Sequence, residues 1–202
     1  MTGAVLSGGE NSRLPYIKGL IKVDGKTIIE RGIEALGGVC DRIVISANAP
    51  ELYFPLGCPV IGDVVADKAP AVGIFSVLRA TGADEVFVLA CDMPFVAAGL
   101  VRRMVELYRE RAESEDGAPE ALVPVWRGLS EPLLAIYSAR SAAVIESMLA
   151  SGAKGLGGML KAMKVLYMTE QDVRRFDPEG RSFTNINTME ELELISPAGG
   201  LR

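Results

Sequence analysis

The stretch that decides the fold is Gly3 to Leu20, GAVLSGGENSRLPYIKGL. Its short apolar run breaks abruptly into a glycine-rich polar segment, which is typical of a buried parallel strand that ends at an anion-binding loop. Gly8 and Gly9 let the main chain turn sharply and press its N–H groups against phosphate oxygens, because glycine has no Cβ. Arg13 and Lys18 add positive charge. We interpret the segment as a phosphate-binding loop, and the alternative is an ordinary turn after a strand.

Two better-known phosphate loops are excluded by spacing. No G-x-G-x-x-G follows the strand, so the dinucleotide fingerprint is absent. Gly25-Lys26-Thr27 is similar to the end of a P-loop, but that motif needs a glycine at position 20, where this chain has Leu20. We therefore interpret Asp24-Gly25 as a turn, and Thr27 with Glu30 as the capping box of a helix.

Apolar strands and amphipathic helices alternate along the rest of the chain. This order predicts an α/β fold: a Rossmann-like three-layer sandwich around a mostly parallel sheet, with ligands at the carboxyl ends of the strands. We expect one domain over residues 1–202, with a frayed tail at 196–202. Strands are expected at 4–6, 42–47, 59–61, 85–92, 121–125 and 132–137, and helices at 27–37, 72–78, 100–108, 141–149 and from Thr188.

The composition limits the possible partners. Acidic residues number 26 against 21 basic ones, a formal charge of -5, so no general basic field attracts nucleic acid or an anionic membrane. No apolar run approaches the roughly 20 residues that span a bilayer, and the N-terminus lacks a signal-peptide pattern. We expect a cytoplasmic protein with neither nucleic-acid nor membrane partners. Cys40, Cys58 and Cys91 form no C-x-x-C pair, and we expect them to be small buried residues.

The chain contains no histidine, which excludes Ser-His-Asp and Cys-His catalysis and histidine-ligated zinc. Its chemistry must use carboxylates, lysines, backbone amides or a hard metal. Asp92 directly follows a buried strand, so it either bonds a neighbouring loop or faces the ligand cleft. A carboxylate beside a phosphate loop suits Mg²⁺, which prefers one or two carboxylates together with nucleotide phosphates. We therefore expect Asp92 to bind Mg²⁺.

Two segments resemble a known family. L-S-G-G-x-x-S-R followed by a lysine, and V-L-A-C-D-M-P-F at Val88 to Phe95, are similar to signature segments of MobA-like nucleotidyltransferases, in particular molybdenum cofactor guanylyltransferases. The resemblance runs from Leu6 to Leu192. It implies the nucleotide-diphospho-sugar transferase type of fold and Mg²⁺-dependent transfer of GMP from GTP to molybdopterin phosphate, with release of pyrophosphate. It also implies transient contact with proteins that supply or receive the cofactor.

The resemblance also implies roles for individual residues. Asn48 and Asp63 are implied to contact the nucleotide. The alternative is that each makes a local loop turn, as these residue types often do. The two asparagines near the C-terminus occupy alternate positions of an extended segment, so their side chains point the same way. The implied roles are catalysis by Lys18, Asp92 and Arg13; nucleotide binding by Leu6, Ser7, Gly8, Gly9, Lys18, Asn48, Asp63 and Asp92; metal binding by Asp92; and acceptor binding by Asn185 and Asn187.

The chain departs from the family pattern at two places. Leu14-Pro15 and Ile17 replace Met-Gly and Asp, and Ala69 to Gly73 (APAVG) replaces Gly-Pro-Leu-Ala-Gly. Pro15 removes one amide donor and stiffens the loop. Two alternatives therefore stay open: a transferase that uses CTP or another phosphorylated acceptor, such as cobinamide phosphate or a sugar phosphate, and a nucleotide-binding module without activity.

A second lysine lies close to Lys18 in the sequence. Lys22 falls in an extended segment in which alternation places Leu20 and Lys22 on one face, and Ile21 and Val23 on the other. We expect Lys22 to be solvated, with its stem along apolar surface, and Lys18 to be the lysine that meets phosphate.

Overall fold

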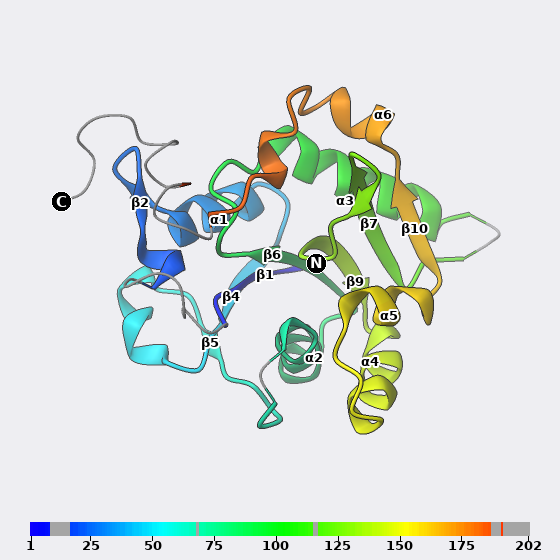
Figure 1. The fold of residues 1–202 in the computed structure, drawn as a ribbon, viewed down its shortest axis with the longest axis horizontal. Coiled ribbons are helices and arrows are strands. Elements are labelled where there is room, and N and C mark those ends of the chain that lie inside the picture. The colour runs from blue at the N-terminus through cyan, green and yellow to red at the C-terminus, as the bar shows by residue number, and fades with distance from the viewer. Residues whose placement is uncertain (9–16, 68, 115–116, 187–190, 192–202) are drawn as a thin grey trace.

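The computed structural model describes residues 1–8, 17–67, 69–114, 117–186 and 191 (Figure 1). An eight-stranded sheet forms its centre, in the order β10-β7-β9-β6-β1-β4-β5, with β8 paired to β7. A separate two-stranded ribbon, β2-β3, follows the phosphate loop. The strands are β1 Thr2–Leu6, β2 Lys22–Val23, β3 Lys26–Thr27, β4 Arg42–Ser46, β5 Val60–Ile61, β6 Glu85–Ala90, β7 Ala121–Trp126, β8 Leu129–Ser130, β9 Leu134–Ser138 and β10 Val165–Met168.

The centre of the sheet is parallel. β1 lies between β4 and β6 and pairs in parallel with both, so Leu6 is opposite Ser46 on one side and Ala90 on the other. The pairs β4-β5 and β10-β7 are also parallel. The carboxyl ends of β1, β4 and β6 therefore meet at one edge of the sheet, as the βαβ order predicts.

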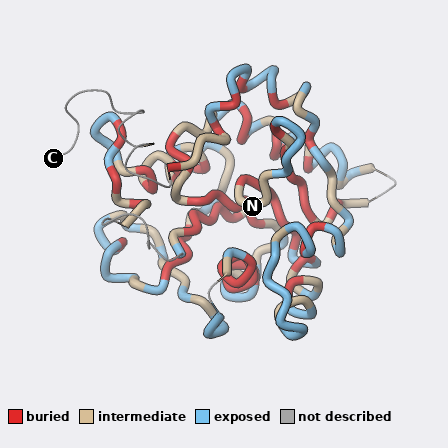
Figure 2. Tube along the Cα trace, viewed as in Figure 1, coloured by how far each residue is buried: buried red, intermediate tan, exposed pale blue. Residues whose placement is uncertain are grey.

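Helices cover both faces of the sheet (Figure 1). One face packs against α1 Ile28–Gly37 and α3 Ala98–Ala112, and the other against α2 Pro70–Thr81, α4 Ser141–Ala150 and α5 Leu156–Lys161. The short α6, Glu170–Arg174, lies against β7. β1 and β9 are buried along their whole length, and β6 is buried from its second residue onward (Figure 2). The expected three-layer α/β sandwich is confirmed.

The N-terminus of α1 has the expected capping box. The Glu30 amide donates to Thr27 Oγ1 at 3.3 Å, and the Glu30 carboxylate accepts from the Thr27 amide at 2.7 Å. The cap orients a helix whose Ile29 and Leu36 are fully buried against the sheet. The hydrogen bonds from Thr27 also hold the pKa of the Glu30 carboxyl below its usual value.

Thr27→Ala should lower the free energy of unfolding by about 1 kcal/mol at pH 7, because the first turn of α1 loses its cap. Glu30 stabilises the native state above its ordinary pKa, and this contribution is lost as the pH falls through the lowered native value. The cost of Thr27→Ala should therefore shrink under acid conditions. Urea unfolding of both proteins at pH 7 and near pH 3 measures the difference, and an equal cost at both pH values would show that the charge plays no part.

Two strands run against the parallel direction. β9 pairs antiparallel with both β6 and β7, and β8 forms an antiparallel hairpin with β7. Only the segment 127–133 joins β7 to β9 through this hairpin. That connection is too short for the crossover that a parallel strand requires. The sheet is therefore mixed, and the start of β9 lies at the same edge as the end of β6.

Several features differ from expectation. Lys18–Leu20, expected as a loop running into an extended segment, forms a 3-10 helix, η1. The sequence pattern missed α5, β10 and α6. The three cysteines are free thiols that are only partly buried. The expected helix from Thr188 and the frayed tail at 196–202 lie outside the described residues, and a single domain over 1–202 stays a prediction.

Candidate active site

The site forms where the central strands end. The Ser7 amide donates to the Ser46 carbonyl at 2.8 Å, and the Cys91 amide donates to the Leu6 carbonyl at 3.0 Å. These bonds continue the ladders one residue past each strand. The chain therefore leaves the sheet side by side after Ser7 and after Cys91, as expected for a ligand site at the carboxyl edge.

Lys18 and Asp92 come together at this edge. Lys18 begins η1, Asp92 follows β6, and Lys18 Nζ lies 3.6 Å from Asp92 Oδ2. Each side chain is 22% exposed. Burial raises the pKa of the Asp92 carboxyl, and the charge of Lys18 only partly opposes this rise. The Asp92 carboxylate therefore lies where a further cation would stabilise its ionised form.

A second carboxylate at the same edge, Glu131, was missed by the sequence analysis. It lies just before β9 and accepts a hydrogen bond from the Leu133 amide at 3.1 Å. Burial raises the pKa of the Glu131 carboxyl, and the negative charge of Asp92 raises it further. The sequence analysis considered residues that follow strands, whereas Glu131 precedes a strand that runs the opposite way. Only the direction of β9 would have identified it.

Asn185 also lies near Asp92. Its neighbour Ile186 donates an amide hydrogen bond to the Asp92 carbonyl at 2.9 Å. The Asn185 Oδ1 atom is shielded from solvent and has no hydrogen-bond partner among the described residues. A buried acceptor without a donor destabilises the fold, so a hydrogen-bond donor at this oxygen would be stabilising. Asn187, its expected companion, lies outside the described residues.

Asn48 and Asp63 bond to each other across the ends of β4 and β5. The Asn48 amide nitrogen donates to Asp63 Oδ2 at 2.6 Å, and the Asp63 backbone amide donates to Asn48 Oδ1 at 2.8 Å. The two residues thus link different loops, which is not the pair of separate local turns named as the alternative. Their contact with nucleotide stays a prediction.

Leu6 and the Ser7 amide are used within the fold, whereas Gly8 borders open space. Leu6 is 7% exposed, and its side chain packs in the core on the α2 side. The Ser7 amide donates to the Ser46 carbonyl and is therefore used within the sheet, while the expected contact of Ser7 with nucleotide stays a prediction. Amide donors for an anion must start at Gly8, around which a Cβ would meet open space. Gly9 and Arg13 lie outside the described residues.

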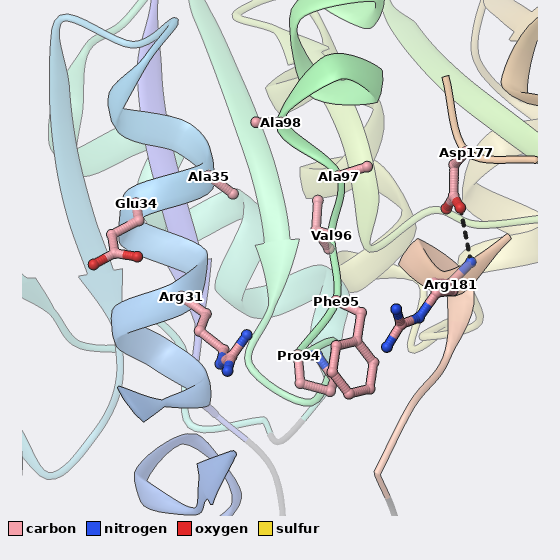
Figure 3. A pocket seen from close by; sticks show the side chains of 10 residues that line it. All are labelled: Arg31, Glu34, Ala35, Pro94, Phe95, Val96, Ala97, Ala98, Asp177 and Arg181. Atoms are coloured by element: carbon pink, nitrogen blue, oxygen red, sulfur yellow. Dashed lines mark hydrogen bonds between the residues drawn. The ribbon is translucent and has the colours of Figure 1, made fainter. Parts of the chain in front are cut away.

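A pocket of about 490 Å³ lies beside the segment that follows Asp92 (Figure 3). The Arg181 guanidinium lies 4.6 Å from the centre of the Phe95 ring, and Arg31 on α1 lines the opposite side of the pocket. The Asp177 carboxylate accepts a hydrogen bond from the Arg181 backbone amide at 3.0 Å, which holds one wall of the pocket in place. Neither Lys18 nor Asp92 lines this pocket, so it adjoins the candidate site without being part of it.

Known proteins are similar to this chain in sequence and in fold. A model of the MobA-like NTP transferase domain matches residues 3–167. The chain belongs to this family. A relative named molybdenum cofactor guanylyltransferase, from Syntrophotalea carbinolica, is 32% identical over 95% of this chain and 89% of its own length. A second, named probable molybdenum cofactor guanylyltransferase, from Methanosarcina mazei, is 33% identical over 94% of this chain and 87% of its own length.

Solved structures of MobA-like proteins and more distant transferases share the fold. Molybdopterin-guanine dinucleotide biosynthesis protein A from Archaeoglobus fulgidus superposes with a TM-score of 0.81 at 29% identity, over 96% of both chains. The 2-C-methyl-D-erythritol 4-phosphate cytidylyltransferase from Thermus thermophilus has a TM-score of 0.64 at 16% identity, over 94% of both chains, which shows likeness of fold alone. Among the described residues, no helix combines the length and apolarity that crossing a membrane requires.

Proposed function

We propose that this member of the MobA-like family transfers GMP from GTP to molybdopterin phosphate and releases pyrophosphate. The observation that carries the proposal is the approach of Lys18 to Asp92 at the carboxyl edge of β1 and β6. The similarity to proteins named molybdenum cofactor guanylyltransferase supports the choice of donor and acceptor.

The side chains at this edge suit such a transfer. The acceptor is a phosphate monoester with a second pKa of about 6, so near neutral pH it is already an anionic nucleophile. No general base is required, in agreement with a chain that contains no histidine. Phosphoryl-type transfer depends mainly on positioning and charge stabilisation. In this proposal Lys18 offsets negative charge on the triphosphate, and the amides from Gly8 onward orient it.

Magnesium is the metal that these residues fit. Asp92 and Glu131 offer hard oxygen donors. Burial raises the pKa of both carboxyls, so a bound cation would stabilise their ionised forms. No group of three or more metal-binding side chains gathers in the described part of the chain. That agrees with a metal held by one or two carboxylates together with nucleotide phosphates. Asp92 would hold the ion, which when bound would neutralise charge that develops on the phosphates.

The acceptor side is proposed to lie beside Asn185. Its shielded Oδ1 lacks a donor among the described residues, and its segment is tied to the Asp92 backbone through Ile186. A pterin carries several N–H groups that can donate a hydrogen bond to this oxygen. Transient contact with proteins that supply or receive the cofactor belongs to the same proposal.

A pyrophosphate-release assay tests the assignment. The four nucleoside triphosphates are each supplied with Mg²⁺, with and without molybdopterin. We expect release that needs both Mg²⁺ and molybdopterin, with GTP preferred. Turnover with CTP alone would overturn the guanylyl assignment, and turnover with cobinamide phosphate or a sugar phosphate in place of molybdopterin would overturn the acceptor. Nucleotide binding without turnover on any acceptor would favour a binding module.

A further inference from the structure

The hydroxyl of Tyr53 contacts Ser7, the residue at which the expected phosphate loop begins. Tyr53 Oη is 2.7 Å from Ser7 Oγ, and either atom can be the donor. Tyr53 lies between two short 3-10 helices, Pro50–Leu52 and Phe54–Leu56, in the connection that follows β4. The residue is 1% exposed and belongs to the main core cluster, so its ring is fixed by packing and its hydroxyl has a defined position.

Ser7 passes this constraint to both charged residues of the site. Ser7 lies next to Cys91, whose amide donates to the Leu6 carbonyl at 3.0 Å, and Cys91 immediately precedes Asp92. On the other side, a Cβ added to Gly19 would lie only 3.0 Å from Ser7 Oγ, and Gly19 immediately follows Lys18. Ser7 therefore lies against both the segment that carries Lys18 and the segment that carries Asp92.

The approach of Lys18 to Asp92 depends on how these two segments are spaced. Their charged atoms lie 3.6 Å apart, although η1 and the end of β6 belong to different parts of the chain. A Cβ added to Gly19 would meet both Ser7 Oγ and Cys91 Cβ, at 3.0 and 3.5 Å, so the hydroxyl lies where these two segments approach each other. Without its bond to Tyr53 Oη, the hydroxyl could rotate to another staggered position and leave this place.

We infer that Tyr53 is a positioning residue of the nucleotide site, which holds the Ser7 hydroxyl in place and thereby sets the spacing of Lys18 and Asp92. The inference rests on the proposed function only in taking this site to bind a nucleoside triphosphate. Tyr53 is too deeply buried to touch the nucleotide itself, so it acts through Ser7.

A double-mutant cycle on GTP affinity tests this role. Tyr53→Phe removes one hydroxyl and keeps the ring, and Ser7→Ala removes the other end of the same bond. Each variant should raise the dissociation constant of GTP with Mg²⁺ by about three- to tenfold, the range expected for one neutral hydrogen bond. The double variant should be no weaker than the weaker single variant, because both changes remove one interaction.

Tyr108→Phe is the matched control. Tyr108 is also 1% exposed, and its hydroxyl donates to the Pro119 carbonyl at 3.4 Å, beside Glu85 at the opposite end of β6. It should leave GTP affinity unchanged, whatever it does to the melting temperature without nucleotide. This comparison separates positioning from a general loss of stability, which both tyrosine variants would share.

The outcomes distinguish the inference from the proposed function. Wild-type GTP affinity in Tyr53→Phe, or additive losses in the double variant, would overturn the positioning role while leaving the transferase proposal intact. If the wild-type chain bound no nucleoside triphosphate, the proposed function itself would fail. Should Tyr53→Phe not fold, Ser7→Ala decides the matter: unchanged affinity in that variant would refute the inference.

Discussion

Asp92→Asn is expected to lower turnover with GTP and Mg²⁺ by about 10³-fold or more. Asparagine keeps the shape of the side chain but removes the negative charge that would hold the metal. In a reaction driven by charge stabilisation, losing the metal site should cost about 4 kcal/mol of transition-state stabilisation, which corresponds to this factor. Steady-state pyrophosphate release at saturating Mg²⁺ measures the loss.

The stability of Asp92→Asn separates a functional carboxylate from a structural one. The native pKa of Asp92 is raised by burial, so its contribution to stability is present below its ordinary pKa and lost as the pH rises through the native value. At neutral pH the ionised form therefore carries a cost, and the nucleotide-free variant should melt no lower than the wild type. A sharp fall in melting temperature with normal turnover would make Asp92 structural.

Asp84→Asn is the control for this experiment. Asp84 is exposed and directly precedes β6, so it lies at the opposite end of the strand that delivers Asp92. Its substitution also removes one negative charge from the chain, but far from the site. Turnover should match the wild type, which would show that the effect of Asp92→Asn depends on position and not on net charge.

Lys18→Ala should raise the dissociation constant of GTP by about ten- to a hundredfold. The side chain is 78% buried beside Asp92 and is expected to make a charge-assisted bond to phosphate, worth roughly 1.5–3 kcal/mol. Isothermal titration of GTP with Mg²⁺ into the variant measures the loss. The affinity should fall more than in Tyr53→Phe, because the bond that is lost involves a charge.

Lys22→Ala is the matched control for Lys18→Ala. Lys22 is exposed on the β2-β3 ribbon, where its neighbours Ile21 and Val23 are buried, as the alternation predicts. Its substitution should change stability and affinity by no more than about 0.5 kcal/mol. If Lys22→Ala were the variant that lost GTP affinity, the assignment of the loop would be wrong, and the roles of Arg13 and Gly8 would change with it.

The sequence predicts those parts of the site that depend on local pattern and strand direction. Asp92 could be placed at this edge because a buried parallel strand delivers its next residues to the ligand site, whereas Lys18 was singled out by the loop and its resemblance to the family. Glu131 could not, because it precedes β9, whose antiparallel direction is a tertiary property. Tyr53 lies among two prolines and a glycine in a segment that looks like surface loop, and only packing against the core shows that it is buried.

The secondary structure follows the same division. α1 was predictable because Thr27 and Glu30 form a capping box within four consecutive residues. α5 was not, since Gly157 and Gly158 give it weak intrinsic helix propensity, and it forms where Met159 and Leu160 bury against the sheet. The Ser7 amide bonds to the Ser46 carbonyl on the neighbouring strand, a contact that the loop motif alone does not show.

The outermost strands of the sheet have a consequence for how copies of the chain meet. β5 is two residues long and β10 is four, so each offers few backbone groups to an incoming strand. Short edge strands are one way in which natural proteins limit aggregation by edge-to-edge pairing. Among the described residues, neither edge is therefore suited to extend the sheet into a neighbouring molecule, and self-association would have to rely on side-chain surfaces of the helices and loops.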